Sequence, residues 1–362
     1  MNQNIFVSRP FLPPIEEYIN YLNEIWESGI LTNNGEMVRR LEKELKHILN
    51  ISNLLLLTNA TLGLQIAIKV LDLTGEIITT PFSFIATSSS IDWQNCTPKF
   101  VDIDSETFNI DPNKIEAKIT EKTSAIMGVH VFSNPCDINV IDNIAKKYNL
   151  KVIYDAAHSL FVNFEGKSIL EYGHISVVSF HAVKLFNTVE GGACITKSEE
   201  LAERIRQMRN FGFDKVGNIT DVGINAKMSE LHAAMGLASI KYIDEIKRRR
   251  KEKHDLYIRM LSDSKDISFQ KINAEQYNYS YMPVVFSNEK ILLTVLDKLN
   301  KNNIYPRRYF YPSLSNLSVP NRSKENLPIA ESISKRILCL PLYYSLEDSD
   351  IKNICELIHS VL

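Results

Sequence analysis

Short apolar runs alternate with amphipathic segments along the first two hundred residues. The runs are typical of buried strands, and the segments between them have the three-to-four-residue spacing of helices. Strands that alternate with helices predict an α/β fold with a mostly parallel sheet and a site at the carboxyl ends of the strands. The expected strands cover residues 54–57, 76–80, 99–101, 125–131, 151–154, 175–180 and 193–196.

The expected helices fall between these runs, and the pattern changes beyond residue 240. A long helical pattern at 231–260 leads into an expected strand at 282–286 and a helix at 291–299. We therefore predict a large α/β domain over residues 1–240 and a smaller α+β domain over 241–362. The other expected helices cover residues 15–26, 41–49, 62–71, 111–119, 139–148, 201–208, 331–336 and 348–362, and residues 214–223 are expected to form a mobile loop.

Charge and cysteine content narrow the function classes. The 362 residues carry a net charge of −2, which gives no basic field for nucleic acid, and no apolar run has the roughly 20 residues of a membrane helix. Five cysteines without a Cys-x-x-Cys pair indicate reduced thiols and no metal site. With no leader-like pattern at the start, we expect a cytoplasmic protein.

Three residues that follow strands carry chemistry. Lys184 follows the run at 175–180, where partial desolvation would lower the pKa of its amine and make it a nucleophile. Asp155 ends the run at 151–154, and His158 stands three residues later. Each has a structural alternative: a solvated surface lysine, an Asx turn and a histidine of the core.

A helix start and an aromatic complete the set. Residues 58–63 join a strand to a helix through small polar residues, which leaves N–H groups for a phosphate or forms an ordinary N-cap. Phe84 could cover a flat ring or belong to the core, and Ser179 ends a strand. Pyridoxal phosphate needs an amine, an anion-binding helix start and an acid partner for its ring nitrogen, so it is the expected cofactor.

The chain resembles a known family over nearly its whole length. It is similar to the DegT-type sugar-nucleotide aminotransferases, which have the fold type I, aspartate aminotransferase-like architecture. Within them the resemblance is to transaminases that form dTDP-4-amino-4,6-dideoxyglucose, through residues 12–14 and 306–312. The motifs that carry it are LTNNG at 31–35, NAT at 59–61, TPFSF at 80–84, YDAAH at 154–158, SFHAVK at 179–184, NFGF at 210–213 and GINAKMSE at 223–230.

The resemblance implies an enzyme that moves the amino group of L-glutamate to a dTDP-4-keto-6-deoxyhexose, for O-antigen or another surface glycan. It implies that Lys184 binds the cofactor aldehyde and then shuttles the proton, with Asp155 on the pyridine nitrogen and His158 on the ring hydroxyl. It also implies a homodimer with shared sites. The remaining implied contacts are Ala60, Thr61 and Ser179 with the phosphate, Phe84 with the ring face, Asn225 with the partner's cofactor phosphate, and Asn33, His181, Lys227, Tyr309 and Tyr311 with the sugar nucleotide.

Three departures from the family pattern lie near the expected site. Val183 stands where a threonine usually precedes the lysine, Gly128 where a proline is usual, and Phe132-Ser133 where Tyr-Gly is usual. Two alternatives stay open: a 3-aminotransferase acting on a dTDP-3-keto-6-deoxyhexose, and a non-catalytic regulatory protein that kept the fold. Relatives that dehydrate sugars carry a histidine in place of the lysine, and no Gly-x-Gly-x-x-Gly pattern favours a nicotinamide dehydrogenase.

Overall fold

The computed structural model describes residues 4–318 and 325–362 and contains a seven-stranded central sheet. The strand order is β2-β10-β9-β6-β5-β3-β4, and β10 alone runs antiparallel to its two neighbours in this sheet. The α/β class with a mainly parallel sheet is therefore confirmed. The strands are β2 (Asn53–Leu57), β3 (Glu76–Thr79), β4 (Thr97–Phe100), β5 (Thr123–Val129), β6 (Lys151–Asp155), β9 (Ile175–Ser179) and β10 (Gly192–Thr196).

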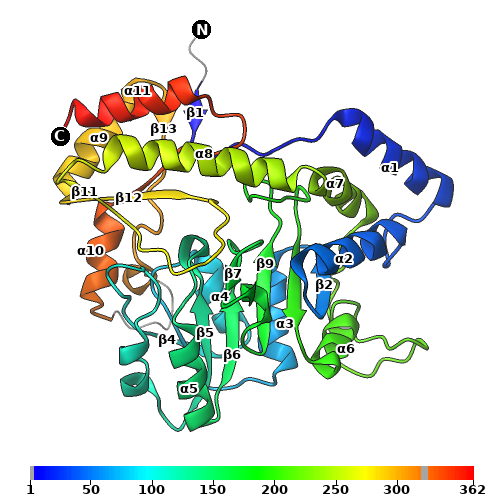
Figure 1. The fold of residues 1–362 in the computed structure, drawn as a ribbon. Coiled ribbons are helices and arrows are strands. Elements are labelled where there is room, and N and C mark those ends of the chain that lie inside the picture. Colours follow the sequence, from blue (N-terminus) through cyan, green and yellow to red (C-terminus); the bar gives the residue numbers. More distant parts are fainter. Residues whose placement is uncertain (1–3, 319–324) are drawn as a thin grey trace.

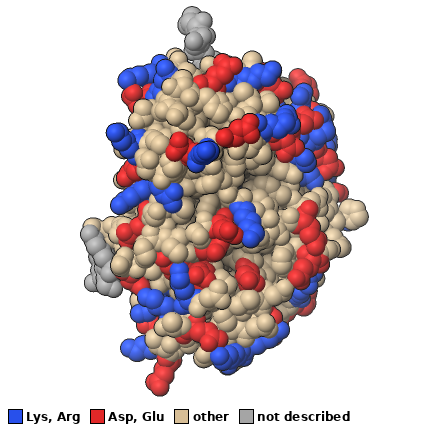
Figure 2. All heavy atoms as spheres, turned by 60° about the vertical axis from the view of Figure 1, so that its left-hand side comes forward, with Lys and Arg blue, Asp and Glu red and all other residues tan. Residues whose placement is uncertain are grey.

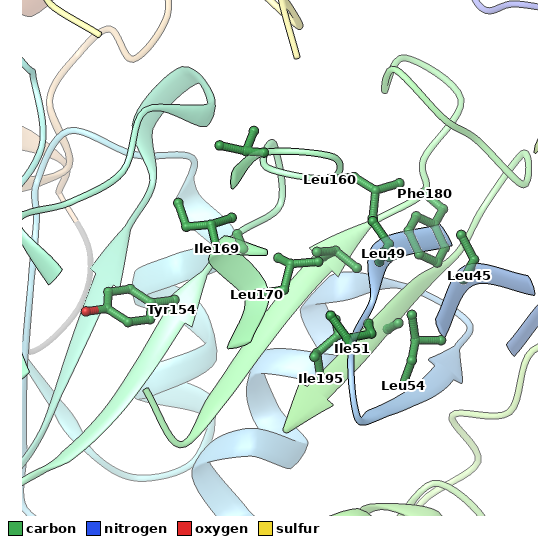
Figure 3. Packing of buried hydrophobic residues seen from close by; sticks show 14 of the residues in the cluster. Leu45, Leu49, Ile51, Leu54, Tyr154, Leu160, Ile169, Leu170, Phe180 and Ile195 are labelled. Atoms are coloured by element: carbon green, nitrogen blue, oxygen red, sulfur yellow. The ribbon is translucent and has the colours of Figure 1, made fainter. Parts of the chain in front are cut away.

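Helices cover both faces of this sheet (Figure 1). Neighbouring residues of one strand point to opposite faces, so Leu56 joins the core under α2 whereas Leu57 joins the core under α3. Figure 3 shows Leu45 and Leu49 of α2 packed against Leu54 and Ile195 of the sheet. The helices of this part are α1 (Ile15–Ser28), α2 (Glu36–Leu49), α3 (Ala60–Val70), α4 (Ile85–Trp93), α5 (Ile138–Tyr148), α6 (Glu199–Met208) and α7 (Glu230–Ile240).

The C-terminal third has a core of its own, built from helices and a three-stranded antiparallel sheet in the order β11-β12-β14. In Figure 1, α8 crosses the molecule beside α11. The N-terminal strand β1 (Ile5–Phe6) pairs with β13 (Ile304–Tyr305), which ties the start of the chain to this part. The division at residue 240 stays a prediction. The remaining elements are α8 (Ile243–Leu261), β11 (Ile267–Phe269), β12 (Met282–Phe286), α9 (Glu289–Lys301), α10 (Pro328–Arg336), β14 (Ile337–Leu340), α11 (Asp348–His359) and a small hairpin of β7 (Asn163–Phe164) and β8 (Lys167–Ser168).

Two predicted helices are wrong in form. Residues 111–119 form two single 3₁₀ turns, Pro112–Lys114 and Glu116–Lys118, although the Asp111 side chain accepts from the Asn113 N–H as a helix cap does. A segment this short closes too few hydrogen bonds to offset helix nucleation. The pattern at 231–260 divides into α7 and α8 at Tyr242, whose hydroxyl bonds Glu17 of α1.

The surface carries charges of both signs. Figure 2 shows lysine, arginine, aspartate and glutamate interspersed over one face of the molecule. Among the described residues, no helix combines the length and the apolar character that crossing a membrane requires.

Candidate active site

Lys184 lies in the loop that follows β9. Its backbone N–H donates to the carbonyl of His181 at 2.9 Å, which forms a tight turn, and its Nζ donates to the Tyr281 hydroxyl at 3.2 Å. Burial lowers the pKa of Lys184 from 10.5 to about 8; the Asp155 carboxylate opposes this shift, and the Arg307 guanidinium adds to it. Near neutral pH a larger share of this amine is therefore neutral than in an ordinary lysine.

Asp155 is the last residue of β6, between β5 and β9, and is buried. One carboxylate oxygen accepts from Thr87 Oγ1 at 2.6 Å, and the other accepts from the Ala157 N–H at 3.1 Å. Burial raises the pKa of Asp155, while these two hydrogen bonds and the Lys184 charge hold it down. A cation that entered the crevice here would favour the ionised carboxylate.

His158 lies beside this pair. Its ring centroid is 4.6 Å from that of Tyr281, and Phe132 and Phe310 stack nearly parallel to it at 6.3 and 6.2 Å. Burial brings the pKa of His158 well below its usual value, so the imidazole is neutral. Its Nδ1 is buried and has no hydrogen-bond partner among the described residues, which points to a polar group of a ligand.

The start of α3 forms an anion cradle near the end of β9. The side chain of Asn59 accepts from the Leu62 N–H at 2.9 Å, and the N–H groups of Ala60 and Thr61 lie in the first turn, where a helix offers them no acceptor. Gly192, paired in register with Ser179, packs so closely that a Cβ would lie 2.7 Å from the Ala60 nitrogen. A glycine at this position therefore lets the start of α3 lie directly beside the end of β9, where Ser179 stands.

Phe84 and Asn225 reach the surface. Phe84 precedes α4, the helix that carries Thr87, and its side chain is 53% exposed. Asn225 is also exposed, although its neighbour Ala226 is tied to the cradle because the carbonyl of Ala226 accepts from the Thr58 N–H at 2.9 Å. Both side chains are thus available to a ligand or to a second protein chain.

Other predicted residues lie in a separate pocket or outside any. Asn33 and Lys227 line a pocket of about 160 Å³ that shares no lining residue with the small pocket of Lys184, His158 and Ser179. Lys227 Nζ donates to Asn210 Oδ1 at 2.9 Å. His181 is exposed, with Nε2 3.6 Å from a Glu190 carboxylate oxygen.

Tyr309 and Tyr311, both predicted to contact the sugar nucleotide, lie in different surroundings. The Tyr309 ring lies 5.6 Å from that of Tyr281, and both line a small pocket with Val183. Tyr311 is 46% exposed and lies under the Arg308 guanidinium, 3.6 Å from it, away from that pocket.

Sequence reasoning missed three residues of the site: Thr87, Phe132 and Tyr281. Thr87 lies one helical turn into α4, so the run that contains Phe84 could have found it. Phe132 was noted only as a departure, and its left-handed backbone, with φ 53°, gives no local signal. Tyr281 comes from a segment without periodicity, and only the tertiary fold brings it to Lys184.

The site fits pyridoxal phosphate, because it offers an amine, a carboxylate at a strand end, an imidazole nitrogen without a partner among the described residues, and a helix start with free N–H groups. With the fold, these features are those of a fold type I transferase that uses a lysine to bind this cofactor. The chain belongs to the DegT/DnrJ/EryC1/StrS aminotransferase family, which matches residues 14–359, and it is a pyridoxal phosphate-dependent aminotransferase.

Individual relatives agree with this assignment. The chain is 41% identical to a dTDP-4-amino-4,6-dideoxy-D-glucose transaminase of Shigella dysenteriae, with 100% of both chains covered. It is 40% identical to an Escherichia coli transaminase of the same name, with 99% of this chain and 98% of that one covered. The structure of DesI in the presence of its TDP-sugar product superposes with a TM-score of 0.94 at 33% identity, covering 99% of this chain and 93% of that chain.

Proposed function

We propose that this enzyme transfers the amino group of L-glutamate to a dTDP-4-keto-6-deoxyhexose and forms dTDP-4-amino-4,6-dideoxyglucose. Full-length identity of 40–41% to two transaminases with that product supports the substrate. The observation that carries the chemistry is the Lys184 amine, whose pKa burial brings down to about 8, beside the buried Asp155. Such an amine can both attack a carbonyl and accept a proton near neutral pH.

Lys184, Asp155 and His158 have distinct proposed roles. Lys184 would hold the cofactor through its amine and, once free, would move the proton that leaves the substrate carbon. Asp155 would keep the ring nitrogen protonated, and Thr87 and the Ala157 N–H fix its carboxylate in place. His158, whose Nδ1 has no hydrogen-bond partner among the described residues, would contact the ring hydroxyl. Pyridoxal phosphate supplies the aldehyde that takes the amino group and the ring that delocalises the electrons released at the α-carbon.

The remaining cofactor contacts follow from the cradle. The N–H groups of Ala60 and Thr61 and the hydroxyl of Ser179 receive the phosphate, because a helix start carries a partial positive charge. Phe84 has an exposed ring that precedes α4 and covers one face of the coenzyme. The phosphate donors are backbone N–H groups and one short side chain, so little conformational entropy is lost when they bind the phosphate.

We propose a homodimer in which Asn225 completes the partner's cofactor site. Its exposed side chain next to the cradle segment supports this reading. Large apolar side chains are also exposed before α2 and in the segment that leads to Asn225, and a second copy of the chain would cover them. These side chains, all more than a third exposed, are Leu12, Ile15, Ile19, Trp26, Ile30, Leu31, Phe211, Phe213, Val216, Ile219, Val222 and Ile224.

We propose that the sugar nucleotide binds between the pocket of Lys184 and the pocket of Lys227. His181 bonds the Lys184 backbone and Tyr309 packs on Tyr281, so we propose that these two residues contact the sugar. Asn33, Lys227 and Tyr311 would contact the nucleotide, in the same subunit or in the partner subunit. Arg209 in this pocket pairs with Glu42, whereas Lys227 has no ion pair among the described residues, so its ammonium is the group that suits a diphosphate. The product would serve O-antigen or another surface glycan, made in the cytoplasm.

The experiment incubates the pure enzyme and pyridoxal phosphate with glutamate and either the 4-keto or the 3-keto dTDP-6-deoxyhexose. NMR of the product identifies the aminated carbon, and mass spectrometry follows the fate of ¹⁵N from labelled glutamate. A 3-amino product alone would replace the proposed substrate with the alternative one. A protein that binds the cofactor but leaves glutamate unchanged would be the regulatory relative.

A further inference from the structure

Tyr281 links the two small pockets of the site. It lines the pocket of Lys184, His158 and Ser179, and it also lines the pocket of Tyr309 and Val183. Its hydroxyl accepts from Lys184 Nζ at 3.2 Å, while its ring lies 4.6 Å from the His158 ring. One side chain from the C-terminal part therefore touches the amine and the imidazole at once.

The backbone around Tyr281 is held firmly. The buried Arg250 of α8 donates from one nitrogen to the carbonyls of Ser280 and Leu342, both at 3.1 Å. On the other side, Asn278 Nδ2 donates to the carbonyls of His158 and Leu160, both at 2.8 Å. These bonds hold the segment around Tyr281 to α8 and to the loop that follows Asp155.

The Tyr281 phenol stays neutral, because burial raises its pKa. A neutral phenol can accept from an ammonium and can donate to a free amine, so it serves both protonation states of a lysine. Two charged groups act on the Lys184 amine: Asp155 raises its pKa and Arg307 lowers it. Tyr281 is the only one of the described groups for which a hydrogen bond to this amine is found.

We propose that Tyr281 is a positioning residue, whose hydroxyl holds the Lys184 amine at the crevice in the direction from which it meets the cofactor and the substrate carbon. This role rests on the proposed aminotransferase function. The hydroxyl fixes one end of a long, flexible side chain that would otherwise sample several rotamers. The ring, packed on His158 and Tyr309, sets where the hydroxyl lies.

The test compares Tyr281→Phe with Tyr277→Phe in the full-length, cofactor-free protein. Tyr277 is a matched control, because its buried hydroxyl donates to the Phe132 carbonyl at 2.6 Å in the same segment. Competitive acetylation over pH 6–10, read by peptide mass spectrometry, gives the pKa of Lys184 alone. The ammonium loses an acceptor in Tyr281→Phe, so this pKa falls by about one pH unit. Tyr277→Phe leaves it within about 0.3 unit of wild type.

Kinetics on the loaded enzyme provide the second measurement. Tyr281→Phe lowers kcat about tenfold with little change in KM, because an interaction with the catalytic amine and none with the substrate is removed. Tyr281→His restores a hydrogen-bonding atom and should reverse part of the decrease in the Lys184 pKa. This variant also replaces the phenylalanine variant in the test if the latter does not fold. An unchanged Lys184 pKa in folded Tyr281→Phe overturns the proposal. If the pKa shifts but the wild type does not transaminate, the positioning stands and the proposed function fails.

Discussion

Thr87 offers the sharpest test of how the protein prepares Asp155. Thr87 is fully buried, and its hydroxyl donates to the Asp155 carboxylate at 2.6 Å. Ser83 Oγ lies 2.7 Å from the same hydroxyl. Thr87 has one proton and gives it to Asp155, so Ser83 must donate to Thr87. The pair forms a short relay that points a hydrogen bond at the carboxylate.

Thr87→Val keeps the shape of the side chain and removes that bond. A hydrogen bond to a charged group contributes about 1.5–3 kcal/mol, so the pKa of Asp155 should rise by a further one to two pH units. Burial already raises this pKa, and Thr87 is the first group that opposes burial. The carboxylate that pairs with a protonated ring nitrogen then forms only at higher pH.

The assay titrates cofactor-free protein with pyridoxal phosphate between pH 6 and pH 9 and follows the absorbance of the bound coenzyme. At the low end of this range the variant should bind about tenfold more weakly than wild type. The difference should shrink as the pH rises, because a higher pH favours the ionised carboxylate in both proteins. Thr87→Ser keeps the hydroxyl and should follow the wild-type curve. Superimposable curves for Thr87→Val and wild type, or an equal loss in Thr87→Ser, would refute the assigned role of this bond.

Three further predictions follow from the same geometry. Lys184→Ala should lose at least a thousandfold in turnover and the visible absorbance of the bound coenzyme, and full activity in this variant would exclude the assignment. An equal mixture of refolded Lys184→Ala and Asn225→Ala protomers should regain about a quarter of wild-type activity, because mixed dimers rebuild one complete site, and no gain would argue against a shared site. Glu230→Ala should lower stability by about 1–3 kcal/mol in thermal unfolding, because the buried carboxylate accepts from the N–H groups of Met37 at 2.7 Å and of Val38 at 3.4 Å.

The fold class could be predicted because the strands are short apolar runs with both faces buried. Val177 and Val178 show this directly, since the first packs under α3 and the second under α2. The order of the strands could not be predicted, because β10 pairs on one side with its chain neighbour β9 but on the other side with β2, more than a hundred residues away. No local pattern records such a contact.

The residues of the site also differ in whether the sequence could predict them. Asp155 and Lys184 follow recognisable strands, so their common position at one edge of the sheet follows from parallel topology. Thr87 and Tyr281 contact these residues only through tertiary packing, over 68 and 97 positions of chain. The break between α7 and α8 has a similar origin, since α7 is buried on all sides whereas α8 is amphipathic.

Two of the residues that depart from the family pattern, Gly128 and Ser133, have physical explanations in this chain. Gly128 lies against the Tyr154 ring, and a Cβ would lie 3.0 Å from a ring carbon, so a larger residue there would press on the strand that carries Asp155. Ser133, with φ 76°, takes a conformation that favours glycine. Its hydroxyl donates to the His158 carbonyl at 2.5 Å, which offsets part of that strain. Gly128 and Ser133 thus contact Tyr154, which precedes Asp155, and His158, and neither exchange removes a proposed catalytic group.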